Sequence, residues 1–136
     1  MAELNLEIIT PEKAVFKDQI ESVTIPGAIG SFQILRDHAP LISSFEIGLI
    51  KIKKKSTDSY YTTAGGTVEV NDNKVLILAD SIEKVDEISV DRAEQSKNRA
   101  EERLKRKNEA DVDEARAKAA LDRALNRLNA VKKYSH

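Results

Sequence analysis

The chain from Val75 to Gln95 reads VLILADSIEKVDEISVDRAEQ, and the pattern of the whole sequence changes within it. Val75 to Ala79 is apolar at every position, which is typical of a buried central strand. From Val90 to residue 136 there is no glycine and no proline, and helix-forming residues dominate. The change predicts two physical units, a β domain over residues 1–86 and a helical unit over residues 87–136.

The charge changes at the same place. Residues 1–86 carry 9 Lys and Arg against 13 Asp and Glu, whereas residues 87–136 carry 13 against 10. The net charge of the whole chain is -1, and aromatic residues make up 4% of it. We therefore expect no nucleic-acid partner and no general attraction to an anionic membrane surface.

Short alternating segments in the N-terminal part predict β-strands with turns between them. Apolar and polar residues alternate at Leu4–Ile8, Val23–Ile25 and Phe32–Ile34, the period of a half-buried strand. Pro26-Gly27 and Asn71-Asp72-Asn73 are turn signals. The sequence therefore predicts an α+β protein whose first domain is an antiparallel β-sandwich.

Another candidate strand, Leu49–Lys53, runs into a group of lysines formed by Lys51, Lys53, Lys54 and Lys55. Such a group could be a patch for a membrane surface. Lysines on a strand more often keep a sheet edge from pairing with other chains. We therefore expect these side chains to point to water or to cover a sheet edge.

Two helices with a short connection are predicted for the C-terminal unit. Ser89 can cap a first helix over Val90–Lys105, and Asp111 and Asp113 suit the start of a second helix that ends near Lys133. The second helix carries an apolar stripe at three- and four-residue steps, formed by Ala117, Leu121, Ala124, Leu125, Leu128 and Val131. We expect an antiparallel hairpin whose thin apolar seam permits more than one docked position.

Several kinds of chemistry are disfavoured. Without cysteine there is no disulfide, no thiolate metal site and no cysteine nucleophile. His38 and His136 lie far apart in the chain, and the acidic residues show no metal-ligand spacing, so we expect neither catalysis nor a metal site. The N-terminus does not read as a signal peptide, and no segment has the ~20 apolar residues that span a bilayer, so we expect no direct membrane insertion.

Several segments, in order and over nearly the whole chain, resemble the epsilon-subunit family of bacterial and chloroplast F-type ATP synthases. The turn Asp37-His38-Ala39-Pro40-Leu41 is similar to the family's Gly-His-Ala-Pro-Leu, with Asp in the place of Gly. Ile29 to Leu35 stands at a Gly-Glu-Leu-Gly-Ile-Leu-like strand, and Gly65 to Val70 resembles Gly-Gly-Phe-x-Glu-Val. Ala124 to Leu128 is similar to the family's helical C-terminus.

The resemblance implies a β-sandwich followed by a helical hairpin, and a role as a non-catalytic central-stalk rotor subunit. In that role the first domain binds the gamma subunit and the ring of c subunits, and the complex couples ion translocation to ATP synthesis. The hairpin can extend toward the alpha and beta subunits, and in many members it restrains ATP hydrolysis. The complex would hold the chain at the cytoplasmic face of the bacterial plasma membrane as a peripheral subunit.

The resemblance also implies where partners bind. The family turn at His38, Ala39 and Pro40 faces the c ring, and we expect Ser31 and Phe32 in an adjacent loop on the same surface. The residue types alone leave a second interpretation of His38 open, a turn histidine that forms a local hydrogen bond. The two interpretations are compatible.

Some members bind ATP as a regulatory ligand in the folded hairpin, through an Ile/Leu-Asp-x-x-Arg-Ala motif and further arginines, and no cofactor is required. The residues here that match this site are Glu83, Ile88, Arg92, Ala93, Arg99, Arg123 and Arg127. Ser89 stands in the place of the motif's Asp, which weakens the candidate ATP site. On physical grounds alone the arginines favour a different interpretation, solvated helix faces balanced by acidic neighbours.

Two other classes of function stay open. A free-standing ATP-sensing binding protein would explain the arginine faces of the two helices. A small hydrolase built on a β-sandwich would need clustered acid–base residues or metal ligands, and the sequence pattern supports neither.

Overall fold

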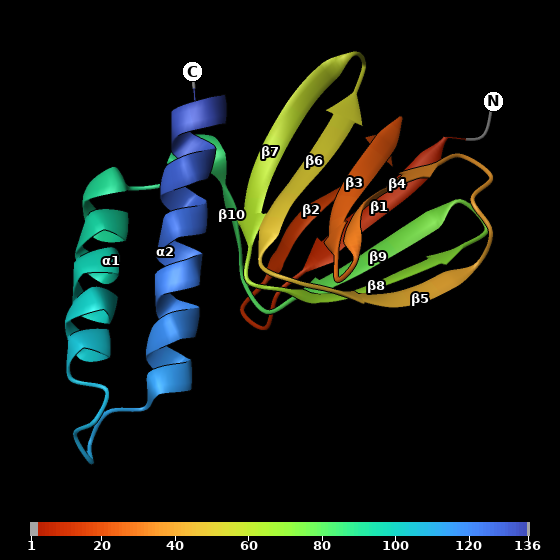
Figure 1. Ribbon diagram of the computed structural model, residues 1–136. Helices are drawn as coiled ribbons and strands as arrows, with labels where there is room; N and C mark the ends of the chain where they lie inside the picture. Colours follow the sequence, from red (N-terminus) through yellow and green to blue (C-terminus); the bar gives the residue numbers. More distant parts are fainter. Residues whose placement is uncertain (1–2, 136) are drawn as a thin grey trace. The chain divides into compact units, whose positions relative to one another are not determined.

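The computed structural model describes residues 3–135, so His136, named above, lies outside the described part. The chain divides into two compact units, one ending at Lys84 and the other beginning at Val85. Figure 1 shows that the first is built of strands and the second of helices. Each unit is described below by itself.

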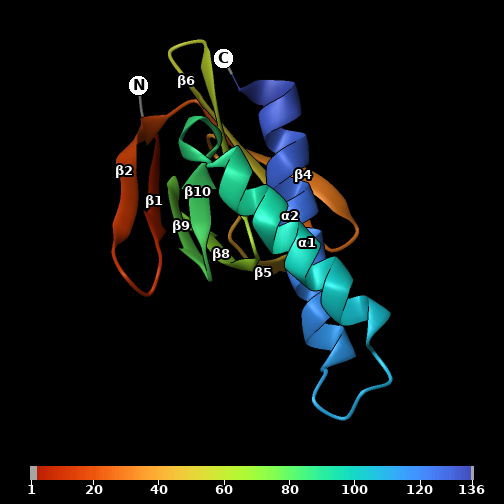
Figure 2. The ribbon, with the colours of Figure 1, turned by 90° about the vertical axis from the view of Figure 1, so that its left-hand side faces the viewer.

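The first unit is a sandwich of two five-stranded sheets (Figures 1 and 2). One sheet has the order β2-β1-β9-β8-β5 and the other the order β10-β7-β6-β3-β4. The strands are β1 (Leu4–Ile9), β2 (Ala14–Ile20), β3 (Ser22–Gly27), β4 (Gly30–Leu35), β5 (Leu41–Phe45), β6 (Gly48–Lys54), β7 (Thr57–Thr63), β8 (Gly66–Asn71), β9 (Lys74–Ala79) and β10 (Ile82–Lys84). The predicted fold class, a β-sandwich followed by helices, is confirmed.

The core of the sandwich is formed by alternate residues of the strands. The predicted alternation holds at Leu4, Leu6 and Ile8, which are at most 2% exposed. Each fully buried aliphatic side chain stabilises the fold by about 1.5–3 kcal/mol relative to an exposed one. The other members of the cluster are Ile20, Val23, Ile25, Ile34, Phe45, Ile50, Ile52, Tyr61, Val68, Val70, Val75, Ile77 and Ala79.

The sequence predicted an antiparallel sandwich, but one pair of strands is parallel. β1 pairs with β2 in the antiparallel direction but with β9 in the parallel direction. A tight hairpin joins only antiparallel strands, and β1 and β9 are far apart in sequence, so no turn dictates their direction. Alternation within a strand reports which residues face the core and carries no information about this pairing.

β9 is the central strand of its sheet, as predicted, with β1 and β8 as its neighbours. The expectation that it is buried on both faces is wrong, because 46% of Leu78 is exposed whereas Ile77 is fully buried. A sandwich needs an apolar surface on only one face of each sheet. Leu78 is therefore an exposed apolar residue on the outer face of the sheet, outside the core.

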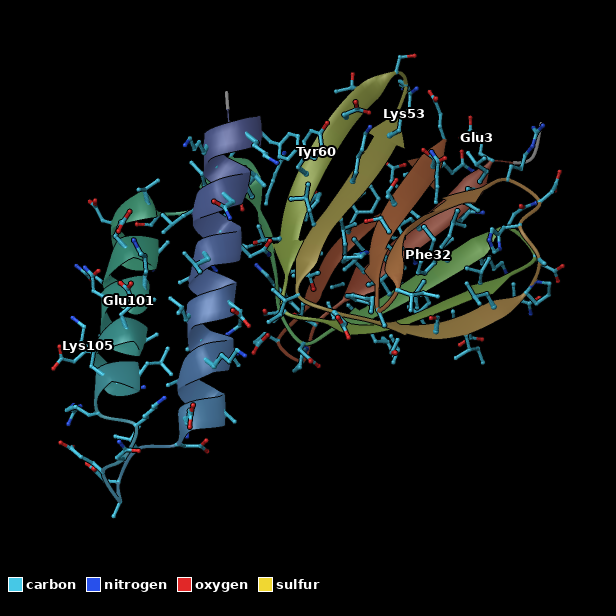
Figure 3. The ribbon with its side chains drawn as sticks, viewed as in Figure 1. Glu3, Phe32, Lys53, Tyr60, Glu101 and Lys105 are labelled. Carbon is cyan, nitrogen blue, oxygen red and sulfur yellow. The ribbon has the colours of Figure 1, made fainter. Side chains whose placement is uncertain are left out.

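The lysine-rich strand does not lie at a sheet edge, so the edge interpretation is wrong. β6 pairs with β3 on one side and with β7 on the other. Lys51 and Lys53 alternate with the buried Ile50 and Ile52 and therefore point away from the core. Figure 3 labels Lys53 on this strand. The alternative expectation, that the lysines point to water, fits Lys53, which is exposed.

One predicted turn is confirmed and another is displaced. Asp72 and Asn73 both have positive φ, 49° and 62°, as the two central residues of a type I′ hairpin between β8 and β9 require. Pro26-Gly27, in contrast, does not end its strand. β3 continues to Gly27, which pairs with Gly30, and the reversal follows at Ala28-Ile29.

The second unit begins with a short 3-10 helix at Val85–Glu87 and continues as two helices, α1 (Val90–Lys105) and α2 (Glu114–Tyr134). The Ser89 Oγ accepts a hydrogen bond from the Arg92 backbone N–H, so the predicted N-cap is confirmed. Asp113 caps α2 in the same way through the N–H of Arg116. The helices run side by side in opposite directions (Figure 1).

The buried residues of these two helices are small. They are Ala93, Ala100, Ala117, Ala124 and Ala130. The larger members of the predicted stripe are less covered: Leu121, Leu128 and Val131 are half-buried, and Leu125 is 36% exposed. Alanine contributes little apolar area, so each buried residue stabilises this unit less than an isoleucine stabilises the sandwich. The expected thin seam is confirmed.

Candidate functional site

The turn that contains His38 carries the chain from one sheet to the other. β4 ends at Leu35 in one sheet and β5 begins at Leu41 in the other. The His38 N–H donates to the Leu35 carbonyl at 3.2 Å and closes a turn, in which Asp37 has a φ of 65°. Aspartate is among the few residues besides glycine that adopt this conformation readily, which explains why it can stand in the place of the family's glycine.

A reciprocal pair of hydrogen bonds holds this turn to the β8–β9 hairpin. The Asp37 N–H donates to Asn73 Oδ1 at 2.6 Å, and Asn73 Nδ2 donates to Asp37 Oδ1 at 3.2 Å. The carbonyl of Asn73 also accepts a hydrogen bond from the Asn5 N–H at 2.8 Å, which connects the same residue to β1. Sequence reasoning identified Asn73 as a turn residue but missed its contact with the His38 turn.

The side chain of His38 is half-buried and its Nδ1 lies 2.7 Å from the carbonyl oxygen of Ala39. A carbonyl only accepts, so this contact favours the proton on Nδ1 and leaves Nε2 as the acceptor of a neutral ring. The local hydrogen bond expected of a turn histidine is therefore present. Ala39 and Pro40 are exposed and available for contact with a partner.

Ser31 and Phe32 are not in a loop, and the structure does not bring them to the His38 turn. Both lie in β4 next to the Gly27–Gly30 reversal, whereas His38 follows the other end of the same strand. Ser31 is exposed, but Phe32 faces inward and packs against the core cluster (Figure 3). The expected surface is thus two separate groups at opposite ends of β4.

Two exposed apolar residues on the outer face of the first sheet were missed by sequence reasoning. Ile42 on β5 is 78% exposed and Leu78 on β9 is 46% exposed. The register places Ile42 opposite Glu69, and Glu69 opposite the half-buried Leu76. Glu69 on β8 therefore lies between Ile42 and the apolar residues of β9, and Ile42 is the more exposed of the two large apolar side chains.

A further exposed apolar residue lies at the Gly27–Gly30 reversal. Ile29 is fully exposed at its tip, between Ala28 and Gly30. The sequence does contain a signal for this exposure: an isoleucine stands between small residues in a two-residue turn, and polar residues usually occupy such turns. Ile29 and the neighbouring Ser31 form one end of the sandwich unit that a partner can reach.

The seven residues of the candidate ATP site belong to both units. Glu83 lies in β10 of the first unit, and the other six lie in the second. Arg92 and Arg99 are exposed, and Arg99 Nη2 donates to the Ser96 Oγ at 3.2 Å. The others are half-buried (Ile88, Arg123, Arg127) or buried (Ala93). Ser89 occupies the acidic position of the motif, and its Oγ is engaged in capping α1.

A hollow of the helical unit lies at the connection between the helices, away from those residues. Its volume is about 430 Å³, and it is lined by Arg103, Arg106, Asp111, Val112, Asp113, Arg116 and Ala117. Arg106 forms ion pairs with Glu102 and Glu109, and the two aspartates add further negative charge. The guanidinium groups are therefore balanced by carboxylates, in agreement with the solvated-face interpretation of this part of the helices.

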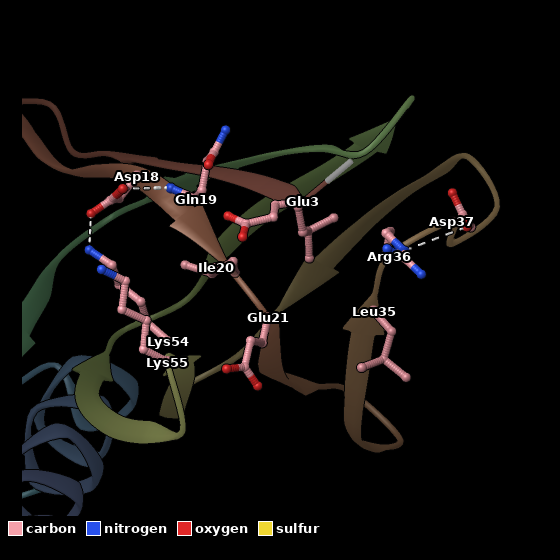
Figure 4. A pocket seen from close by; sticks show the side chains of 11 residues that line it. Glu3, Asp18, Gln19, Ile20, Glu21, Leu35, Arg36, Asp37, Lys54 and Lys55 are labelled. Carbon is pink, nitrogen blue, oxygen red and sulfur yellow. Dashed lines mark hydrogen bonds and ion pairs between the residues drawn. The ribbon is translucent and has the colours of Figure 1, made fainter. Parts of the chain in front are cut away.

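A larger hollow of about 600 Å³ lies in the first unit beside the His38 turn (Figure 4). Arg36 and Asp37 line one side of it and are 3.8 Å apart at their closest charged atoms. On another side Lys54 donates to Asp18, which also accepts from the Gln19 N–H. The Lys54 ammonium group, with help from that N–H, holds the pKa of Asp18 below its ordinary value.

Among residues 3–135, no group of three or more His, Asp or Glu residues is arranged to hold a metal ion. Within the same residues, neither α-helix has the length and apolar character of a membrane-spanning segment.

Two family models cover nearly the whole chain. Residues 3–85 match the model described as "ATP synthase, Delta/Epsilon chain, beta-sandwich domain". Residues 86–132 match "ATP synthase, Delta/Epsilon chain, long alpha-helix domain".

Curated relatives match over similar lengths. A protein of Nitratidesulfovibrio vulgaris named ATP synthase epsilon chain is 45% identical over 125 residues, which is 92% of each chain. Proteins of the same name from Symbiobacterium thermophilum and Desulfitobacterium hafniense are 41% and 46% identical, and cover 100% and 93% of this chain. These alignments cover 98% and 95% of the two relatives.

Solved structures share the fold at lower identity. A chain in the Euglena gracilis mitochondrial ATP synthase, in the structure of its OSCP/F1/c-ring, has a TM-score of 0.79 and 18% identity. The match covers 96% of this chain and 82% of that one. A chain in the central stalk/c-ring structure of the Tetrahymena thermophila mitochondrial ATP synthase has a TM-score of 0.67 and 18% identity, and the match covers 96% and 97%.

Proposed function

The chain belongs to the delta/epsilon family of ATP synthase subunits, and from this premise we propose that it is the epsilon subunit of a bacterial F-type ATP synthase. It is a non-catalytic rotor subunit of the central stalk and takes part in coupling ion translocation to ATP synthesis. The complex would hold it as a peripheral subunit at the cytoplasmic face of the plasma membrane. The observation that carries this function is the 41–46% identity to bacterial epsilon chains over both units, in the same order.

Two surfaces of the sandwich support two contacts within the complex. One combines the His38–Pro40 turn with the exposed Ile42 at the start of β5, and the other is the end that carries Ile29 and Ser31. Because the two groups lie at opposite ends of β4, one flat contact does not explain both. We assign the surface with the His38–Pro40 turn to the ring of c subunits, as the family resemblance implies, and the end with Ile29 and Ser31 to the gamma subunit. Phe32 would support the second contact from the core rather than touch the partner.

The helical unit is proposed to regulate ATP hydrolysis by extending toward the alpha and beta subunits. The five buried residues of α1 and α2 are alanines, so separating α1 from α2 exposes little apolar surface. An element that is held weakly can populate a second conformation at a cost of a few kcal/mol. A partner that binds the extended form better would then shift the hairpin toward it.

A regulatory ATP site in the hairpin is the finer proposal. It rests on the match of Ile88, Arg92 and Ala93 to the family motif and on the basic positions Arg99, Arg123 and Arg127. Arginine forks suit phosphate oxygens. The capping role of Ser89 explains how the family's acidic residue can be replaced without loss of the helix start.

Reconstitution tests the proposed function. The chain is mixed with a cognate alpha–beta–gamma complex that lacks its epsilon subunit, and both co-elution and ATP hydrolysis are measured. A variant that ends at residue 86 keeps the whole core cluster of the sandwich and serves as the matched comparison. We expect both forms to co-elute with the complex and only the complete chain to slow hydrolysis, by roughly tenfold or less.

The other outcomes are informative in different ways. Binding by both forms with no slowing of hydrolysis would keep the stalk role and remove the regulatory role. Failure of the complete chain to bind a cognate gamma subunit would contradict the proposed function and favour a free-standing ATP-sensing protein.

A further inference from the structure

We propose that Asn73 is a positioning residue for the interface turn at His38–Pro40: its side-chain amide holds the turn in the conformation that a partner subunit binds. The inference rests on the proposed function, because that function gives the turn its binding role. It starts from the reciprocal contact between Asp37 and Asn73, called the clasp below.

The clasp uses both ends of one amide. Asn73 Oδ1 accepts the backbone N–H of Asp37 at 2.6 Å, and Asn73 Nδ2 donates to the Asp37 carboxylate at 3.2 Å. A side-chain amide offers a neutral acceptor and a donor on two separate atoms. One bond therefore fixes the backbone of the turn, while the other fixes a side chain next to His38.

The turn needs such a contact because it lies between the two sheets. Leu35 is the last residue of β4 and Leu41 the first of β5, so residues 36–40 belong to no strand ladder. A crossing segment without ladder hydrogen bonds has more conformational freedom than the strands it joins. The clasp connects it to a residue 36 positions away in sequence.

Asn73 is itself well anchored. It occupies a type I′ turn with a φ of 62°, and its carbonyl accepts the Asn5 N–H of β1 at 2.8 Å. The next residue begins β9, the central strand of the sheet. The amide is thus carried by a rigid part of the sandwich, which is the requirement for a residue that orients another.

The clasp gives the side chain of Asp37 a role that glycine could not fill. Asp37 adopts a φ of 65°, which glycine would adopt without cost. A glycine there would leave Asn73 Nδ2 without its carboxylate acceptor and would add freedom to the turn. This chain therefore exchanges a freely mobile residue for one that is held from the hairpin turn beside it.

Three variants of the complete chain test the inference. Asn73→Gly removes the amide and tolerates the positive φ. Asn73→Asp places a carboxylate against the carboxylate of Asp37. The double variant Asn73→Asp with Asp37→Asn restores the pair with the roles exchanged, so that the amide at position 37 donates and the carboxylate at position 73 accepts. Asp72→Gly is the control, because Asp72 is exposed, lies in the same turn and also has a positive φ, 49°.

Two quantities are measured: the affinity for an epsilon-free complex that contains the alpha, beta and gamma subunits together with the c ring, and amide hydrogen exchange of residues 37–39 in the free chain. For Asn73→Gly and Asn73→Asp we expect roughly tenfold weaker binding and faster exchange at these amides, with the unfolding midpoint close to wild type. The exchanged pair should recover most of the affinity, and Asp72→Gly should bind like wild type. If the double variant recovers its affinity, the weaker binding of Asn73→Asp comes from a misplaced turn and not from a general loss of structure.

The outcomes distinguish the inference from the function on which it rests. Wild-type affinity for Asn73→Gly, or unchanged exchange at residues 37–39, would overturn the inference and leave the proposed function intact. If the wild-type chain does not bind the complex at all, the proposed function fails and the inference fails with it.

Discussion

Asp18 and Lys54 connect the two sheets at one open side of the sandwich. Asp18 stands in β2 opposite Leu6 and on the same face of the sheet, where its side chain is exposed, and Lys54 is the last residue of β6 in the other sheet. The lysine donates to Asp18 Oδ2, and the neighbouring Gln19 N–H donates to Oδ1. These donors stabilise the carboxylate, which is why the pKa of Asp18 is lowered in the folded protein.

This lowered pKa predicts a pH-dependent contribution to stability. The ordinary pKa of the group is 3.8, and the folded value lies below it, so the contribution is complete above pH ~5 and disappears as the pH falls through the folded value. The Asp18→Asn variant should have a lower urea midpoint than wild type at pH 7, and the difference should shrink below pH 4. Urea titrations of both proteins from pH 7 to pH 3 provide the measurement.

The matched control is Asp58→Asn, because Asp58 pairs with Lys51 on the outward side of the sheet at 3.7 Å. Its effect at pH 7 should be smaller than that of Asp18→Asn, since within residues 3–135 Asp58 pairs with Lys51 alone, whereas Asp18 accepts from both Lys54 and the Gln19 N–H. A difference for Asp18→Asn that stays constant down to pH 3 would refute the assignment.

The N-terminus of α1 shows how one residue serves an element and a site at once. Ser89 is the N-cap of α1, and its Oγ accepts the N–H of Arg92 at 3.3 Å. The same position carries an aspartate in the family's ATP motif. Aspartate caps a helix as well as serine does, and its charge suits the positive end of the helix. Serine in place of aspartate therefore keeps the cap, and its effect would fall mainly on the proposed ATP site.

Two substitutions separate these roles. Ser89→Ala should destabilise the start of α1 by about 1 kcal/mol, seen as faster amide exchange at residues 90–93. Ser89→Asp should keep the cap and bind ATP roughly tenfold more tightly than wild type in a calorimetric titration, because it restores a charged acceptor. If neither wild type nor Ser89→Asp binds at millimolar ATP, the proposed ATP site is wrong.

The whole molecule combines two units with very different interiors. The sandwich is filled by large aliphatic side chains such as Ile25, Ile50 and Ile77, all fully buried. The buried residues of α1 and α2 in the second unit are alanines. Buried apolar area sets most of the stability of a unit, so the two units should differ in stability within one chain.

Urea unfolding should therefore occur in two steps. Helical circular dichroism at 222 nm should be lost at a lower urea concentration than the exchange protection of β8 and β9. Ile77→Ala should lower the free energy of unfolding of the second step by about 2–5 kcal/mol and leave the first step unchanged. A single coincident transition, shifted as a whole by Ile77→Ala, would contradict independent stability.

Local sequence rules determined most of the elements of this protein. The absence of glycine and proline after Val90, with Ser89 and Asp113 as caps, predicts both helices nearly to the residue. The alternation at Leu4, Leu6 and Ile8 and the Asn71–Asn73 turn predict a strand and a hairpin. Each of these signals depends on a few neighbouring residues, so the amino-acid sequence alone is enough to predict the element.

Only the tertiary structure decided how distant segments meet. The strand order places β6 inside its sheet. The strand pairing makes β1 parallel to β9, and the bounds of β4 put Ser31 near one of its ends and His38 beyond the other. The same pairing brings Asn73 to Asp37 and leaves Ile42 exposed. Alternation tells which residues of a strand share a face, but not which strand lies beside it or what covers its other face. Those choices depend on the packing of the complete sandwich, where each contact is set by all the others.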